Sequence, residues 1–85
     1  MEPSQNIRQQ LRDFIDGRLK AKNDLNPFDD TTPLVSSGRM DSLDVIEMVI
    51  FLEDKFGLNF AKIGFDQSHV DSVDSIIRLV KQGAA

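Results

Sequence analysis

The sequence has no cysteine, no tryptophan and no tyrosine, and its only histidine is His69. The lack of cysteine excludes disulfides, zinc–thiolate sites and a cysteine nucleophile. A single histidine also leaves few ways to assemble a histidine metal site or a Ser-His-Asp triad. The apolar runs fall far short of the roughly 18 residues that a membrane span needs. We therefore expect a cytoplasmic protein with no membrane span, no metal site and no catalytic residues of its own.

The length of 85 residues predicts a single domain over residues 1–85, because chains this short do not divide into two hydrophobic cores. Hydrophobic residues make up 40% of the chain and charged residues 28%. This balance is typical of a globular domain and too apolar for a disordered chain.

The charge is concentrated in one segment. The chain has 10 basic and 14 acidic residues, for a net charge of −4. Residues 41–56 contain five acidic residues and only one basic residue, Lys55. The net charge of this segment is therefore −4, the same as that of the whole chain. We expect no nucleic-acid partner, because phosphate binding needs a basic footprint. A basic protein surface is the natural complement.

Apolar residues recur at helical rather than strand spacing, which predicts an all-α fold. The first amphipathic helix is expected over about residues 4–20. Residues 21–40 are rich in residue types that break helices, so they predict a long loop. The apolar residues expected to hold this loop against the core are Leu25, Phe28, Leu34 and Val35.

A second helix is expected over residues 42–56. Asp41 is a suitable N-cap, Asp44 can complete a short capping box, and Gly57 stands where a C-cap glycine belongs. Its inward face should contain Val45, Met48, Val49, Leu52 and Phe56. The helix is apolar over more than one stripe, so some apolar side chains must reach solvent or a partner.

The remainder of the chain gives weaker signals. Residues 58–63 are ambiguous between extended and loop structure, and residues 64–69 are compatible with a short helical turn. A last helix should start near Asp71 or Ser72 and end by Gly83. It is expected to bury Val73, Ile76, Ile77 and Val80.

Ser42 is the residue whose position best suits covalent modification. It follows a capping aspartate at the first position of an acidic helix, where a hydroxyl is accessible rather than packed. A phosphate ester there would meet unpaired N–H groups and the positive end of the helix dipole. No histidine is nearby in sequence to activate the hydroxyl. We therefore interpret Ser42 as a residue that another enzyme modifies.

Two strings around this serine carry a family resemblance, Asp41-Ser42-Leu43-Asp44-Val45-Ile46-Glu47 and Glu53-Asp54-Lys55-Phe56-Gly57. Together they resemble the helix-two signature of acyl carrier proteins. Leu34, Gly38 and residues 72–77 also stand where that family has comparable residues. The resemblance extends from about residue 5 to residue 82.

This resemblance implies a small four-helix bundle with a short third helix and a long loop between the first two. It implies that Ser42, flanked by Asp41, receives 4'-phosphopantetheine from coenzyme A through a phosphopantetheinyl transferase. The protein would then carry acyl groups as thioesters in fatty-acid or related lipid metabolism, as a monomer and without enzymatic activity.

The resemblance also implies a partner-facing side of the second helix. Its partners would be acyl-transferring, synthase or ligase enzymes with basic docking surfaces. The docking residues implied by matching positions are Leu43, Asp44, Ile46, Glu47, Ile50, Glu53 and Asp54.

Two departures from the family pattern keep alternatives open. Lys55 stands where a third acidic residue is usual. The string from Phe65 to Ser68 resembles the D-alanyl carrier branch, although His69 and Val70 replace the bulky aromatic typical of it. An aminoacyl or D-alanyl carrier is therefore an alternative. A further alternative is a helical adaptor without a carrier function, whose acidic helix binds a basic groove.

Overall fold

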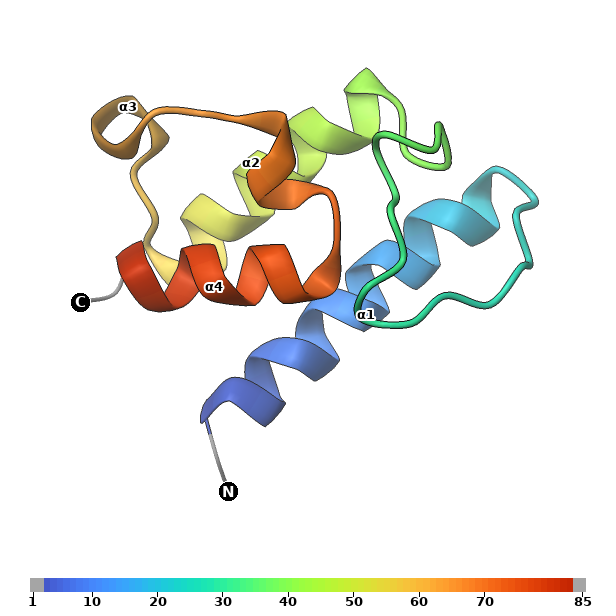
Figure 1. Cartoon of the computed structure of the whole chain (residues 1–85), viewed down its shortest axis with the longest axis horizontal. Coiled ribbons are helices and arrows are strands. Elements are labelled where there is room, and N and C mark those ends of the chain that lie inside the picture. Colours follow the sequence, from blue (N-terminus) through green and yellow to red (C-terminus); the bar gives the residue numbers. More distant parts are fainter. Residues whose placement is uncertain (1–2, 84–85) are drawn as a thin grey trace.

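The structure, a computed structural model, describes residues 3–83, with side chains for residues 6–82. Its elements in chain order are α1 (Pro3–Ala21), α2 (Ser42–Phe56), α3 (Phe60–Ile63), the 3₁₀ turn η1 (Gln67–Val70) and α4 (Val73–Gly83) (Figure 1). No strand occurs within residues 3–83, so the predicted all-α class is confirmed. α1 extends one residue beyond the predicted range at each end, and α2 has the predicted bounds.

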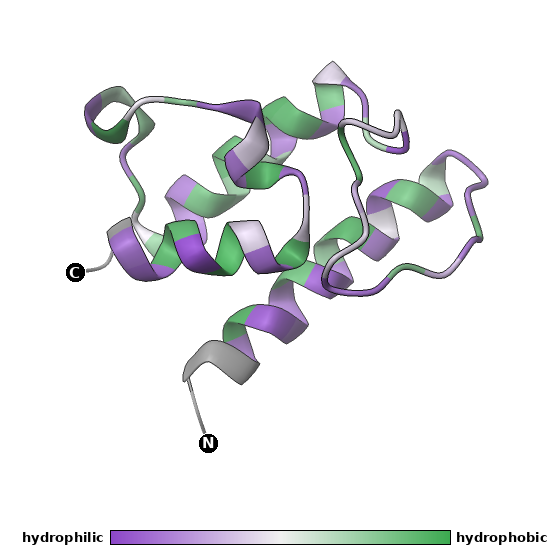
Figure 2. Ribbon diagram, viewed as in Figure 1, coloured by the Kyte–Doolittle hydropathy of each residue, from purple (hydrophilic) through white to green (hydrophobic). Residues whose placement is uncertain are grey.

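α1 is amphipathic because its apolar residues recur at steps of three and four. Leu11, Ile15 and Leu19 are almost completely buried, and Ile7 and Phe14 are partly buried beside them. This face packs against α4. Figure 2 shows hydrophobic and hydrophilic residues following one another along both helices. The predicted amphipathic character of the first helix is thus confirmed.

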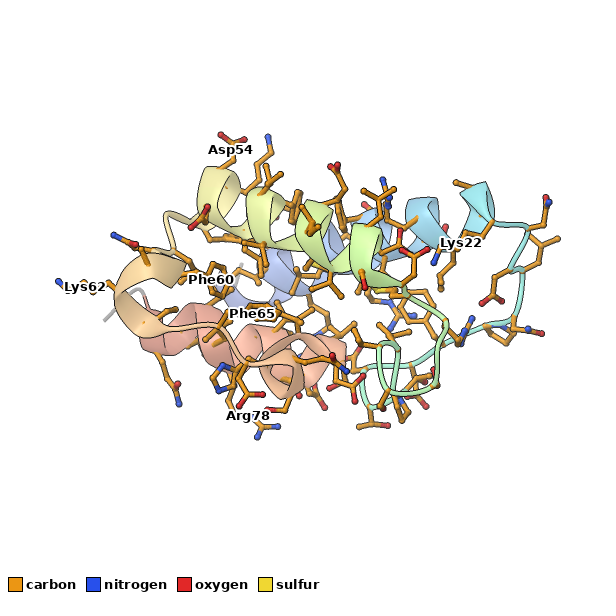
Figure 3. The ribbon with its side chains drawn as sticks, turned by 90° about the horizontal axis from the view of Figure 1, so that it is seen from above. Lys22, Asp54, Phe60, Lys62, Phe65 and Arg78 are labelled. Atoms are coloured by element: carbon orange, nitrogen blue, oxygen red, sulfur yellow. The ribbon has the colours of Figure 1, made fainter. Side chains whose placement is uncertain are left out.

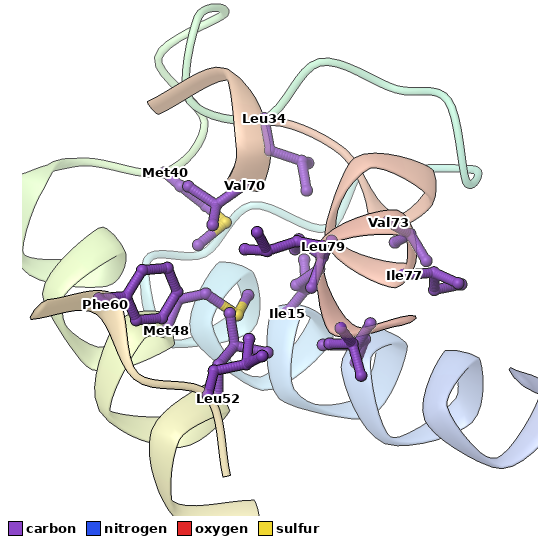
Figure 4. Packing of buried hydrophobic residues seen from close by; sticks show 14 of the residues in the cluster. Ile15, Leu34, Met40, Met48, Leu52, Phe60, Val70, Val73, Ile77 and Leu79 are labelled. Carbon is purple, nitrogen blue, oxygen red and sulfur yellow. The ribbon is translucent and has the colours of Figure 1, made fainter. Parts of the chain in front are cut away.

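α4 starts directly after Ser72, whose hydroxyl accepts a hydrogen bond from the Ser75 N–H at 3.2 Å. Ser72 is therefore the residue that caps the last helix. The predicted inward face of this helix is confirmed, and Leu79 is buried with it. Figure 4 shows these side chains meeting the apolar residues of α1, α2 and the loop, among them Met48 and Leu52.

The long loop between α1 and α2 is held by the residues just before α4. The backbone N–H of Leu34 donates to the Asp71 backbone oxygen at 2.7 Å. One oxygen of the Asp71 carboxylate accepts from the N–H groups of Leu34, Val35 and Ser36 at 3.1, 2.7 and 2.9 Å. The other accepts from the Ser36 hydroxyl at 2.7 Å. Asp71 thus fixes the loop that leads into α2.

Three of the four residues expected to anchor this loop are buried or partly buried, and one is exposed. Leu34 is completely buried, as predicted, and Phe28 and Val35 are partly buried against the core. Leu25 is 77% exposed, so its prediction as an anchor is wrong. Met40 is buried instead, and its N–H donates to the Leu34 backbone oxygen at 2.9 Å.

The segment between α2 and α4 contains two short turns of helix. α3 forms within the ambiguous segment because Asn59 caps it, with the Lys62 N–H donating to its side chain at 3.2 Å. The Glu53 carboxylate also accepts from the Phe60 N–H at 3.3 Å. η1 overlaps the expected helical turn and buries Val70.

Candidate functional site

The site begins at the N-terminus of α2, where the predicted capping box is present. The Asp41 carboxylate accepts from the Asp44 N–H at 3.0 Å, and the Asp44 carboxylate accepts from the Asp41 N–H at 3.1 Å. The other end of α2 stops at Gly57, whose φ of 69° suits glycine. Ser42 is therefore the first helical residue, and it is exposed.

Asp44 lies beneath this start of the helix rather than on its surface. Its side chain is 1% exposed, and it forms ion pairs with Arg18, at 2.8 Å, and with Lys22. Burial by itself raises the pKa of Asp44, but hydrogen bonds from Lys22, the Asp41 backbone and Arg18 outweigh it, so the pKa is lowered. The prediction that Asp44 faces a partner is wrong, because its carboxylate is buried against α1.

Lys22 connects several parts of the site. Its ammonium lies 3.6 Å from the Asp41 carboxylate and donates to the Arg39 backbone oxygen at 3.0 Å. The two carboxylates at the start of α2 therefore face two cations, Arg18 and Lys22. The region around Ser42 is close to neutral in charge, although the surrounding sequence segment is strongly acidic.

A groove opens beside Ser42. It has a volume of about 500 Å³ and is lined by Val35, Met40, Asp41, Ser42, Val45, Ile46, Phe65 and Gln67. A second hollow of about 230 Å³ shares three of these residues and is lined only by Val45, Ile46, Val49, Ile50 and Phe65. Since the two share part of their lining, they lie side by side along α2, and the smaller one is lined only by apolar side chains. Together they are called the groove along α2.

Phe65 lines both hollows, and it is the one shared lining residue that does not belong to α2. It is 49% exposed, and its ring packs edge-on against Phe60 with the ring centroids 5.9 Å apart. Figure 3 shows Phe65 between α2 and α4. The groove therefore has one wall made by α2 and another that includes the segment between α3 and η1.

The outer face of α2 carries an apolar stripe. Leu43, Ile46 and Ile50 are 59%, 55% and 54% exposed. This confirms that some apolar side chains of the helix reach solvent. Of the acidic residues expected around them, Glu53 and Asp54 are exposed and Glu47 is partly exposed. Their role in docking stays a prediction.

Glu53 has a structural role that the sequence analysis missed. Its hydrogen bond to the Phe60 N–H ties the end of α2 to the first residue of α3. Arg18 and Lys22 were missed as well. A signal for them was present, because two basic residues four positions apart in the first helix and its end share one side and complement an acidic helix start.

Other chemistry receives no support in the part of the chain that the structure describes. His69 is exposed in η1 and does not line the groove beside Ser42. Among residues 3–83, no group of three or more acidic or histidine side chains is placed to hold a metal ion. None of the described helices is long and apolar enough to cross a membrane.

Comparison with known protein families and with curated proteins found no match to this chain. The function is therefore inferred from the residues and geometry of the site.

Proposed function

We propose that this protein is an acyl carrier protein whose Ser42 hydroxyl is the attachment point for 4'-phosphopantetheine. The group would come from coenzyme A through a separate phosphopantetheinyl transferase. The observation that carries the proposal is the position of Ser42, which is exposed at a capped helix start and lines a partly apolar groove. The resemblance of the surrounding residues to the carrier signature supports the same assignment.

The residues present fit a phosphate ester at Ser42. The carboxylates of Asp41 and Asp44 would repel a phosphate, but Arg18 and Lys22 already pair with them. The first N–H groups of a helix lack intrahelical partners, and the helix dipole favours negative charge at this end. When attached, the group supplies a thiol that holds cargo as a thioester. The chain has no cysteine of its own.

The groove along α2 supports an apolar acyl cargo. Its smaller hollow is lined only by apolar side chains, and burying an apolar chain against them releases about 25 cal/mol for each Å² removed from water. The rival proposal of an aminoacyl or D-alanyl cargo rests on the Phe65-Asp66 string. In the structure Asp66 caps η1, accepting from the Ser68 N–H and hydroxyl at 2.9 Å each. Local capping is thus enough to explain this aspartate.

The exposed stripe on α2 supports docking to partner enzymes. Leu43, Ile46 and Ile50 provide an apolar centre, and Glu47 and Asp54 provide acidic groups near it. Such an arrangement fits a partner with an apolar contact surrounded by basic side chains. The carrier would contribute presentation and docking, and the partner enzymes would perform the chemistry.

Mass spectrometry tests the attachment. The purified chain is incubated with coenzyme A and a promiscuous phosphopantetheinyl transferase, beside a carrier known to be modified. We expect a mass gain of one phosphopantetheine that is lost in Ser42→Ala and retained in Ser37→Ala, a variant of an exposed serine in the preceding loop. No gain under conditions that modify the reference carrier would instead favour an unmodified helical adaptor.

A second experiment distinguishes the cargo. The modified protein is offered to an acyl-activating ligase and to an amino-acid-activating ligase, and the thioester formed is identified by mass. We expect the acyl thioester. Formation of only the aminoacyl thioester would assign the protein to the rival carrier class.

A further inference from the structure

The arginine on α4 differs from every other arginine in the chain. The side chains of four arginines are ion-paired with aspartates, in the pairs Arg8–Asp30, Arg12–Asp30, Arg18–Asp44 and Arg39–Asp24. Arg78 has no ion pair and no side-chain hydrogen bond among residues 6–82. It is exposed, and Figure 3 shows it on the opposite side of the molecule from Asp54 at the end of α2.

Three carboxylates of η1 and the start of α4 have partners other than Arg78. Asp74 lies one helical turn earlier on α4, at the spacing of a helical ion pair, but it lies 3.4 Å from the Arg8 guanidinium on α1. Asp66 accepts two hydrogen bonds from Ser68. Asp71 binds the loop before α2. These acids are thus engaged elsewhere, and the Arg78 guanidinium has no acid partner among residues 6–82.

Arg78 also lies at a groove. A hollow of about 390 Å³ between η1 and α4 is lined by Ser68, His69, Ser75, Arg78, Leu79 and Gln82. Three of these side chains, His69, Arg78 and Gln82, have nitrogen donors that bond to nothing in the described part of the chain. A hollow that gathers a free guanidinium, an imidazole and an amide is suited to hydrogen-bond acceptors with negative charge.

We propose that this groove binds the oxyanion of a small ligand, a phosphate or carboxylate group, with Arg78 as the main contact. The guanidinium offers parallel N–H donors that match two oxygens of either group. His69 and Gln82 would donate from the sides of the groove. The site is separate from Ser42 and does not depend on any modification there.

Nuclear magnetic resonance on the full chain tests the proposal. Inorganic phosphate and acetate are titrated separately, with sodium chloride adjusted to hold the ionic strength constant. We expect saturable shifts centred on the backbone amides of His69, Arg78 and Gln82. The anion that saturates at the lower concentration identifies the preferred oxyanion.

Two variants on α4 distinguish binding at Arg78 from a general effect of positive surface charge. Arg78→Ala should weaken binding about tenfold, because a charged hydrogen-bond partner is lost. Lys81→Ala removes an equal charge from an exposed residue outside the groove lining and should leave binding nearly unchanged. Both changes are at exposed positions, and the spectra themselves report whether the fold is retained.

The proposal is overturned if the shifts do not saturate or are spread over all the basic residues. It is equally overturned if Arg78→Ala and Lys81→Ala weaken binding to the same extent, since that result would mean a general response to surface charge.

Discussion

Replacing Asp44 tests the central ionic contact of the site. This carboxylate is 1% exposed, whereas the side chains of Arg18 and Lys22 are 30% and 31% exposed. Removing one partner of a fully buried ion pair costs about 3–5 kcal/mol. Because both cations can regain water, we expect Asp44→Asn to lower the free energy of unfolding by about 2 kcal/mol. Asp44→Ala also loses half of the capping box and should lower it by about 1 kcal/mol more.

Urea unfolding followed by circular dichroism measures this effect. With a slope near 1 kcal/mol per M, the Asp44→Asn midpoint should fall by about 2 M at neutral pH. Asp54→Asn removes an exposed carboxylate from the same helix and should change the free energy by less than about 0.5 kcal/mol. If Asp44→Asn matched Asp54→Asn, the proposed contribution of the ion pairs would be refuted.

The pH dependence gives an independent check on the same contact. The folded pKa of Asp44 lies below its ordinary value of 3.8, because hydrogen bonds from Lys22, Asp41 and Arg18 outweigh the opposing effect of burial. A lowered carboxyl pKa contributes stability that is fully present above the ordinary value and is lost as the pH falls through the folded value. The difference between the wild-type protein and Asp44→Asn should therefore be constant near neutrality and shrink below pH 3.8. A difference that persists in strong acid would contradict this reasoning.

Three further predictions concern the loop, the docking face and the core. Asp71→Ala should accelerate hydrogen exchange in the loop before α2, because the backbone N–H groups of Val35 and Ser36 lose their acceptor. The Leu34 N–H keeps the Asp71 backbone oxygen as its acceptor and should be affected least. Unchanged exchange at Val35 and Ser36 would contradict the clamp. Association with a partner enzyme, measured by stopped flow, should slow with added salt and in Glu47→Lys more than in Asp16→Lys, because steering depends on charge at the docking face; rates indifferent to both would exclude steering. Leu34→Ala should lower the free energy of unfolding, measured by urea titration, by about 2–5 kcal/mol. Leu25→Ala changes a residue that is 77% exposed and should have little effect. Equal losses of free energy in the two variants would contradict the assigned burial.

The bounds of α2 and its caps could be predicted because their signals are local. Asp41 and Asp44 satisfy each other's N–H groups within one turn, and Gly57 adopts the left-handed conformation that ends the helix. The buried stripes of α1 and α4 were predicted for a related reason, since helical spacing places those residues on one face.

The segment between α2 and α4 could not be assigned in the same way. α3 is a single turn, too short for a periodic pattern, and its first N–H, that of Phe60, donates a hydrogen bond to the carboxylate of Glu53 seven residues earlier. The burial of Met40 in place of Leu25 likewise goes with a contact across the loop, the hydrogen bond from the Met40 N–H to the Leu34 backbone oxygen at 2.9 Å. Neither of these two hydrogen bonds can be predicted from the residue types of the segments that contain them.

The sequence by itself determined that the chain is helical, where α2 begins, and that Ser42 stands at that start. Only the tertiary structure decided the electrostatics around this serine, because it buries Asp44 and brings Arg18 and Lys22 against it. It also decided that Arg78 alone among the arginines lacks an aspartate partner within the described chain. The physical reason is that net charge along a segment is additive, whereas pairing and burial depend on which residues of other helices lie within a few ångströms.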